Sequence, residues 1–146
     1  MCLILVAWRV HPDYPLVVAA NRDEFFARPT ALAAPWPEAP GVIAGRDLQA
    51  GGTWLGVGPA GRFAALTNVR NPAAHRADAA SRGALVADFL RGQQSAPDYV
   101  AILAGRAADF NGFNLLCGDG EQLYWFSNAG GAARALAPGI YGLCNH

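Results

Sequence analysis

The sequence of 146 residues contains no lysine, so all eleven of its basic residues are arginine. A chain without lysine cannot form a Schiff base or use a lysine amine as its nucleophile. The arginines are balanced by eleven acidic residues, which gives a formal net charge of zero. Because a nucleic-acid-binding surface needs an excess of basic residues on one face, this balance argues against nucleic acid as a partner.

Cysteine is scarce as well, and Cys2, Cys117 and Cys144 form no CxxC pair. An odd number of scattered thiols predicts free cysteines in a reducing compartment, and hence a cytoplasmic protein. Cys144 and His146 could supply half of a metal site, but no second pair of ligands accompanies them. We therefore predict no metal and no other cofactor. No apolar run approaches the ~20 residues of a membrane span, and no secretory signal is visible.

The chain is rich in apolar residues, which make up 53% of the sequence against 15% charged residues. This composition predicts one folded domain over residues 1–146. Apolar runs separated by turn residues predict the following strands: 2–9, 16–20, 53–57, 62–67, 113–117, 122–127, 133–136 and 140–144. The stretch 21–47 contains four prolines and little periodicity, so it is predicted to be a long surface excursion.

Two helices are predicted between the two groups of strands. The first covers residues 82–91 after the N-cap Ser81, with an apolar stripe of Leu85, Val86, Phe89 and Leu90. The second begins at Ser95 and runs to about residue 108, with a stripe of Tyr99, Ile102 and Leu103. The order strands, helix pair, strands predicts an α+β domain with a mainly antiparallel sheet and helices against one face.

Cys2 is the first candidate functional residue. Small second residues permit removal of the initiator methionine, which would leave the Cys2 thiol and a free α-amine on one residue. The amine, with a pKa of about 7.7–8.0, could accept the thiol proton and so produce the thiolate, which is the nucleophilic form. The alternative is that Cys2 is a small buried hydrophobe in the first strand.

The polar run Asn21-Arg22-Asp23-Glu24 follows the second predicted strand. In a tight hairpin the end of the second strand lies beside the start of the first, which places Arg22 or Asp23 near Cys2. An arginine there would favour the thiolate, and a carboxylate would hold the α-amino group. The alternative is that these four side chains form a solvated turn.

Seven sequence blocks, spread over the whole chain, resemble the NRDE family, also called the transport and Golgi organization family. They are Met1-Cys2-Leu3-Ile4, Asn21 to Phe26 with Arg28-Pro29, Gly51 to Gly56, Ala65 to Arg70, Ser81-Arg82-Gly83, Asn111 to Leu116 and Gly142 to His146. The resemblance implies an N-terminal nucleophile (Ntn) hydrolase-like αββα sandwich. Members of this family usually continue beyond the last block. We therefore expect an N-terminal portion whose sandwich is incomplete, with an open sheet edge that favours self-association.

The resemblance also implies roles for particular residues. In the cysteine branch of the Ntn hydrolases, which includes bile-salt hydrolases and penicillin V acylases, Cys2 matches the nucleophile. Arg22 and Asp23 match an arginine and an aspartate after the second strand, although here the two are adjacent. Asn145 resembles an asparagine of the oxyanion hole, and Asn68 is a candidate for the other polar contact. A strand-end turn residue is the alternative for Asn145.

Two functions remain open from the sequence. The first is hydrolysis of an amide or related acyl bond in a small-molecule substrate, with Cys2 as nucleophile. The second is a non-catalytic carrier of an apolar ligand such as an acyl-CoA, a lipid or haem, as the trafficking associations of eukaryotic relatives suggest. Trp36, Trp54, Phe25 and Phe26 could line such a ligand site, although packing is the alternative role for them.

Overall fold

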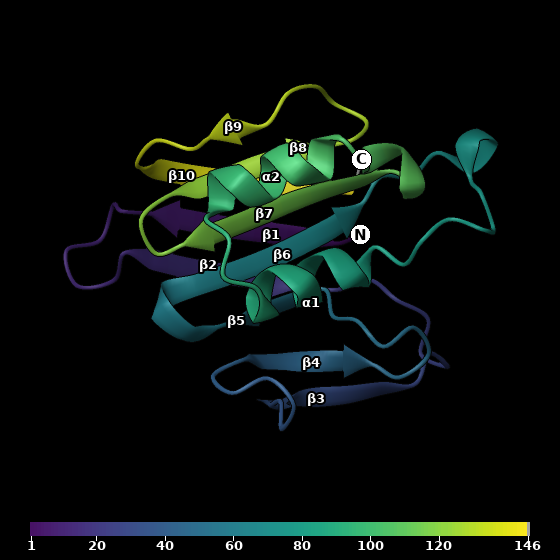
Figure 1. Cartoon of the computed structure of the whole chain (residues 1–146), viewed down its shortest axis with the longest axis horizontal. Helices are drawn as coiled ribbons and strands as arrows, with labels where there is room; N and C mark the ends of the chain where they lie inside the picture. Colours follow the sequence, from purple (N-terminus) through teal and green to yellow (C-terminus); the bar gives the residue numbers. More distant parts are fainter. Residues whose placement is uncertain (146) are drawn as a thin grey trace.

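The first strand of the protein joins both ends of the chain in one sheet. In the computed structural model, which describes residues 1–145, β1 (Leu3–Trp8) lies between β2 (Leu16–Asn21) and β10 (Gly139–Cys144) in a three-stranded antiparallel sheet. The predicted hairpin of the first two strands is confirmed, with Leu3 opposite Asn21 and Trp8 opposite Leu16. The strand nearest the start of the chain and the last described strand consequently lie side by side (Figure 1).

A second sheet has seven strands, each antiparallel to its neighbours and arranged in chain order. The strands are β3 (Thr30–Pro35), β4 (Ile43–Asp47), β5 (Leu55–Val57), β6 (Arg62–Asn68), β7 (Phe113–Asp119), β8 (Leu123–Ser127) and β9 (Arg134–Ala135). The strands predicted after residue 52 are all present, with ends shifted by a few residues. Short 3-10 turns lie at Pro59–Gly61, Pro72–Ala74 and Ala107–Asp109.

The prediction of a surface excursion over 21–47 is wrong, because this stretch contains the hairpin of β3 and β4 that extends the larger sheet. All six residues of β3 are exposed, and β3 is an edge strand of the larger sheet. An edge strand tolerates proline since its outer N–H groups have no ladder partner, and Pro35 is the last residue of β3. The alternation of buried and exposed residues that would have identified this strand is absent.

Both helices cover the same face of the seven-stranded sheet (Figure 1). All four residues predicted as the stripe of α1 (Gly83–Arg91) are buried, which confirms that stripe. The helix nevertheless has Arg82 as its N-cap, without a side-chain cap, so the prediction of Ser81 was one residue early.

The second helix, α2 (Ala96–Ala104), is shorter than predicted. Its predicted N-cap is confirmed, because the Ser95 hydroxyl oxygen accepts a hydrogen bond from the backbone N–H of Asp98. The predicted stripe is wrong at Ile102, which is 55% exposed. The buried residues of α2 are Ala96, Val100 and Leu103.

Two apolar cores hold the layers together. The core between the sheets contains Ile4, Val6 and Trp8 of β1 packed with residues such as Phe63 and Leu116 of the larger sheet. The other core lies between the larger sheet and the helices. The layers are therefore helix, sheet and sheet, which correspond to three of the four layers of an αββα sandwich. The prediction of an α+β fold of this Ntn-hydrolase-like type, with mainly antiparallel sheets, is confirmed. No helix within residues 1–145 has the length and hydropathy needed to span a membrane.

Candidate functional site

The strand register places Cys2 between two of the residues singled out from the sequence. Leu3 lies opposite Asn21 on β2 and opposite Cys144 on β10. Extending both registers by one position sets Arg22 on one side of Cys2 and Asn145 on the other. Because side chains alternate along a strand, these positions share the face of Ile4, which points toward the larger sheet. Cys2 is 9% exposed and Asn145 is 3% exposed.

Cys2 lies on the wall of a cavity of about 750 Å³. This volume falls within the range of roughly 300–1,000 Å³ that is typical of small-molecule sites. Four of the candidate residues line the cavity, namely Cys2, Arg22, Asp23 and Asn68. Asn145 is next to Cys2 in the sheet order but does not line the cavity, so the structure brings four of the five candidates to one space.

Asp23 makes the direct polar contacts to Cys2. The Asp23 backbone N–H donates to the Cys2 sulfur over 3.2 Å, and the thiol faces the Asp23 carbonyl oxygen at 3.8 Å. The Asp23 carboxylate binds the Met1 ammonium group and also accepts a hydrogen bond of 3.0 Å from Arg70. Hydrogen bonding and charge from that ammonium group, and then the Arg70 guanidinium, lower the pKa of Asp23. Asp23 therefore combines a donor to the thiol with an acceptor for an α-ammonium group.

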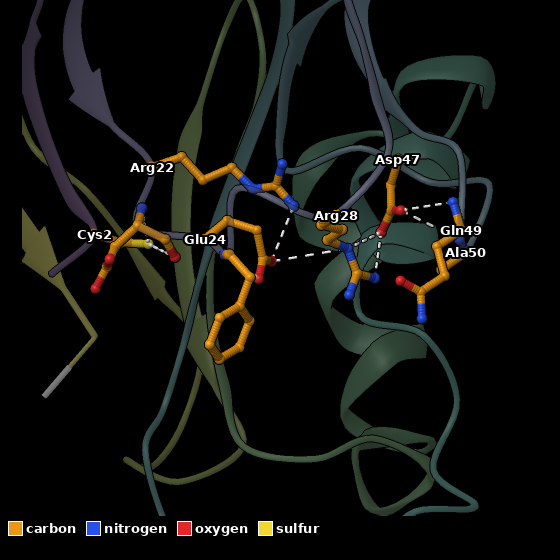
Figure 2. Close-up of polar contacts among 9 residues, drawn as sticks. Cys2, Arg22, Glu24, Arg28, Asp47, Gln49 and Ala50 are labelled. Carbon is orange, nitrogen blue, oxygen red and sulfur yellow. Dashed lines mark hydrogen bonds and ion pairs between the residues drawn. The ribbon is translucent and has the colours of Figure 1, made fainter.

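Arg22 is part of a chain of alternating charges that leads away from Cys2 (Figure 2). Its guanidinium donates to Glu24 over 3.1 Å. Arg28 lies 3.8 Å from the same Glu24 oxygen and 2.6 Å from Asp47 at the end of β4. Glu24 therefore compensates the charge of Arg22, and the loop after β2 is tied to the larger sheet.

Asp47 anchors this chain of charges. One carboxylate oxygen binds Arg28, and the other accepts hydrogen bonds from the backbone N–H groups of Gln49 and Ala50 at 3.0 and 3.2 Å. Burial on its own would raise the pKa of Asp47, but Arg28 and the two N–H donors outweigh it and lower the pKa. The hydrogen bond to Asp47 raises the pKa of Arg28. Sequence reasoning missed Glu24, Arg28 and Asp47 as site residues, although Glu24 and Arg28 lie inside a quoted block.

The end of β10 is held by two polar side chains from the larger sheet. The Thr67 hydroxyl donates to the Cys144 carbonyl oxygen over 3.1 Å, and the Asn114 amide donates to the same oxygen over 3.3 Å. Asn114 also donates to the Thr67 hydroxyl oxygen over 3.3 Å. The next residue, Asn145, has a buried side-chain oxygen with no hydrogen-bond partner within residues 1–145. This oxygen is therefore an unused hydrogen-bond acceptor on the residue next to Cys2 in the sheet.

The four aromatic candidates do not form one group. Trp54 lines the cavity. Trp36 is 5% exposed in the core under the helices, and its indole N–H donates to the Ala44 carbonyl oxygen. Phe25 and Phe26 are 84% and 109% exposed. Of the four aromatic candidates, Trp54 is the one that lines the cavity, and packing in the core explains Trp36.

Metal ligands do not gather in the part of the chain that the structure describes. Within residues 1–145 there is no group of three or more His, Cys, Asp or Glu side chains that could hold a metal ion. Cys117 and Cys144 are free thiols, as is Cys2. His146, the other half of the site considered with Cys144, lies outside the described residues.

Comparison with known proteins identifies the family. The model of the family "Transport and Golgi organisation 2" matches residues 1–146. A Transport and Golgi organization protein 2 homolog of Bos taurus is 38% identical over 99% of this chain and 57% of its own length. The homolog of Homo sapiens is 36% identical over the same shares. The Drosophila melanogaster Transport and Golgi organization protein 2 is 42% identical over 62% of this chain and 35% of its own length.

The chain thus spans a little more than half the length of the Bos taurus and Homo sapiens relatives, 57% in each case. The matched part includes the cavity and the residues around Cys2, because the family model covers all of them. On this match the chain belongs to the Transport and Golgi organisation 2 family.

Proposed function

We propose that the protein, after removal of Met1, is a cysteine N-terminal nucleophile hydrolase that acts on an amide or related acyl bond. One observation carries this proposal. The Cys2 sulfur lies on the wall of a ligand-sized cavity and accepts a hydrogen bond from the Asp23 N–H, while the Asp23 carboxylate binds the terminal ammonium group of the chain. Once Met1 is removed, the α-amine of Cys2 would be the base on the same residue as the thiol, and the Asp23 carboxylate would be the group that orients it.

The reaction needs only the Cys2 residue and water as reactants. Without Met1, the α-amine of Cys2 takes the thiol proton, and the thiolate attacks the carbonyl carbon to form a carbon–sulfur bond. The tetrahedral intermediate then expels the amine, which leaves with the proton held by the α-ammonium group. Water, deprotonated by the same α-amine, hydrolyses the thioester and releases a carboxylic acid. The proton returns to the thiol, so the enzyme is regenerated.

Three residues are proposed to support this chemistry, namely Asp23, Asn68 and Asn145. The N–H of Asp23 stabilises the thiolate, because a hydrogen bond to the charged form favours that form. The Asp23 carboxylate orients the α-ammonium group through the type of contact that it makes to Met1. Asn145 and Asn68 are the candidate donors to the oxyanion, and loss of one such donor typically lowers kcat by ~10²–10³-fold.

A carrier of an apolar ligand is the second candidate, and a part of the cavity wall favours it. The apolar side chains of Leu32, Trp54, Leu55 and Leu66 line the same cavity as Cys2. The names of the relatives refer to transport, which a carrier of a lipid, an acyl-CoA or haem would fit. A carrier would use the cavity without any covalent step at Cys2.

Acylation of Cys2 distinguishes the two functions. The purified protein is first checked by mass spectrometry for the absence of Met1 and is then incubated with p-nitrophenyl butyrate. A hydrolase should release nitrophenol in a burst and carry the acyl group on Cys2. Cys2→Ala should abolish the burst, whereas the matched control Cys144→Ala should retain it.

Two results would contradict the hydrolase proposal. The first is an intact Met1 on the native protein, because Met1 separates the terminal amine from the Cys2 thiol. The second is equally slow labelling of the wild type and Cys2→Ala. If a fatty acid or haem then binds both proteins with the same affinity, the carrier function is favoured.

A further inference from the structure

Arg82 is a charged residue of the cavity that the proposed reaction does not use. It lies in the Ser81-Arg82-Gly83 turn directly before α1 and lines the cavity that contains Cys2. It also lines a second cavity of about 610 Å³, which shares Asn68, His75 and Asn111 with the first. Arg82 therefore stands where the two spaces meet.

Close backbone packing fixes this position. A Cβ added to Gly52 would lie 2.4 Å from the carbonyl carbon of Gly83, so only glycine permits this approach. The Thr53 N–H donates to the Gly83 carbonyl oxygen over 3.2 Å. One guanidinium nitrogen of Arg82 donates to the Gly112 carbonyl oxygen over 2.9 Å. The side chain is thus anchored through one of its N–H groups, while a guanidinium carries five.

The charges around the cavity do not balance. Its lining contains more arginines than carboxylates: Arg22, Arg28, Arg46, Arg76 and Arg82 against Asp23, Glu24 and Asp47. All three carboxylates are engaged, since Asp23 binds Met1 and Arg70, Glu24 binds Arg22 and Arg28, and Asp47 binds Arg28. The overall charge of the chain is zero, so positive charge is concentrated at this cavity.

Arg82 is the partly buried member of this excess. Within residues 1–145 it has no carboxylate at ion-pair distance. Arg46 binds Glu38, and Arg76, also without a carboxylate in that range, is exposed and donates to the Ala108 carbonyl oxygen. Burial, and then the nearby Arg28 charge, lower the pKa of Arg82. A partly desolvated cation without a counter-ion is costly for the protein, and an anionic ligand would offset that cost.

We propose that Arg82 binds a carboxylate or phosphate group of the molecule that occupies this cavity. The planar guanidinium fork matches the oxygen geometry of both groups. Binding of an anion at Arg82 does not require catalysis at Cys2. If the ligand is the substrate of the proposed function, on which this part of the inference rests, that substrate carries an anionic group in addition to its acyl bond. Cys2 would contact the acyl carbon and Arg82 the anionic oxygens.

Binding is tested in Cys2→Ala protein, which cannot turn over a substrate. Calorimetric titrations compare glutarate and phenyl phosphate with the neutral glutaramide. We expect at least one anion to bind and glutaramide not to bind, and Arg82→Gln should weaken anion binding at least tenfold. Arg82→Lys should retain part of the affinity. Arg106→Gln, which removes an exposed arginine that lies outside the cavity and pairs with Asp109, should change nothing.

The two anions also distinguish between the two ligand groups. Higher affinity for glutarate indicates a carboxylate, and higher affinity for phenyl phosphate indicates a phosphate. The proposal is overturned if neither anion binds, or if Arg82→Gln binds them as well as Arg106→Gln does. Thermal unfolding of each variant shows whether it is folded. If Arg82→Gln is unfolded, the comparison of Arg82→Lys with the parent protein decides, and equal affinity there overturns the proposal.

Turnover separates this proposal from the proposed function. Wild-type protein is incubated with the glutaryl amide of aminomethylcoumarin, which carries a free carboxylate, and with the methyl ester of the same amide, which is neutral. Preference for the anionic amide, reduced at least tenfold in Arg82→Gln, supports both proposals. Binding of an anion through Arg82 without cleavage of either amide leaves the binding site standing and refutes hydrolysis of these amides. Cleavage of both amides with equal kcat/KM in every protein supports hydrolysis and refutes an anionic substrate held by Arg82.

Discussion

Gly52 is the glycine at which the addition of a single methyl group should destabilise the fold most. A Cβ at Gly52 would lie 2.4 Å from the carbonyl carbon of Gly83 and 2.6 Å from its oxygen. Non-bonded carbon atoms prefer separations of about 3.5–4.0 Å. Because both contacted atoms belong to the backbone, no rotation of a side chain can relieve the overlap. The loop before β5 and the start of α1 would have to separate.

The cost of Gly52→Ala follows from two contributions. Overpacking of a well-packed site costs about 1–3 kcal/mol, and a rigid contact belongs at the upper end of that range. The separation also stretches the hydrogen bond of 3.2 Å from the Thr53 N–H to the Gly83 oxygen, and such a bond contributes about 1 kcal/mol. We expect a loss of about 3 kcal/mol in the free energy of unfolding. For a domain of this size that loss lowers Tm by roughly 10 °C.

Urea unfolding followed by tryptophan fluorescence measures this loss, with two glycines as matched controls. Gly51 has a φ of +77° but no atom within 4 Å of an added Cβ, so Gly51→Ala should cost only about 1–2 kcal/mol for its backbone conformation. Gly105 has ordinary contacts at 3.5 Å and a φ of −70°, so Gly105→Ala should change stability by less than about 0.5 kcal/mol. If Gly52→Ala proves no more destabilising than Gly51→Ala, the close approach of the two backbones is refuted.

Three other substitutions or treatments probe the site and its supports. Thr67→Val removes the hydroxyl that donates to the Cys144 carbonyl oxygen at the end of β10. Urea unfolding should therefore show a loss of about 1 kcal/mol in the free energy of unfolding, and acylation of Cys2 should slow. If neither value changes, this hydrogen bond does not hold the end of β10 in place. Burial on its own would raise the pKa of Asp119. Hydrogen bonds from the backbone N–H of Ala96, at the start of α2, and from those of Glu121 and Gln122, in the turn after β7, outweigh burial and lower this pKa. Since this folded pKa lies below the unfolded value of about 3.9, the stabilisation is complete above that value and is lost as the pH falls through the folded pKa. Asp119→Asn should therefore show a smaller loss of stability in acid than the wild type, and parallel curves would contradict this. Burial, and then the Asp119 charge, raise the pKa of Cys117 to about 12, so peptide mapping should find Cys117 unmodified by iodoacetamide at pH 8 until urea is added; rapid modification of the native protein would disprove its burial.

The strands of the core were predictable because their burial leaves a pattern in the sequence. β6 and β7 are apolar runs in which nearly every residue is buried, and glycine- or proline-containing turns separate the neighbouring strands. The hairpin of β3 and β4 was not predictable from the same signal. β3 is an exposed edge strand of mostly small residues, and it shows no alternation of buried and exposed positions that would mark it. The prediction that Ile102 is buried was wrong for the opposite reason: the residue is apolar and fits the helical pattern, but an apolar residue in a helix does not have to be buried.

The candidate site was predictable only in part, because one of its two strand pairings joins neighbouring segments of the sequence and the other joins distant ones. The pairing of β1 with β2 is a hairpin, and the local order of strands sufficed to place Arg22 or Asp23 near Cys2. The pairing of β1 with β10 joins the two ends of the chain, and no local pattern specifies such a contact. The family resemblance alone singled out Asn145. Arg28 and Asp47 were missed because an ion pair between a loop residue and the end of a distant strand has no signature in one sequence.

The structure also changes the electrostatic argument for Cys2. From the sequence, Arg22 was the cation expected to favour the thiolate. In the structure Glu24 lies 3.1 Å from Arg22 and neutralises most of its effect at a distance. The remaining positive influences on the sulfur are the Asp23 N–H at 3.2 Å and the α-ammonium group that the Asp23 carboxylate binds. Both depend on Asp23 and on the position of the chain terminus, so removal of Met1 should alter the reactivity of Cys2 more than loss of the Arg22 charge.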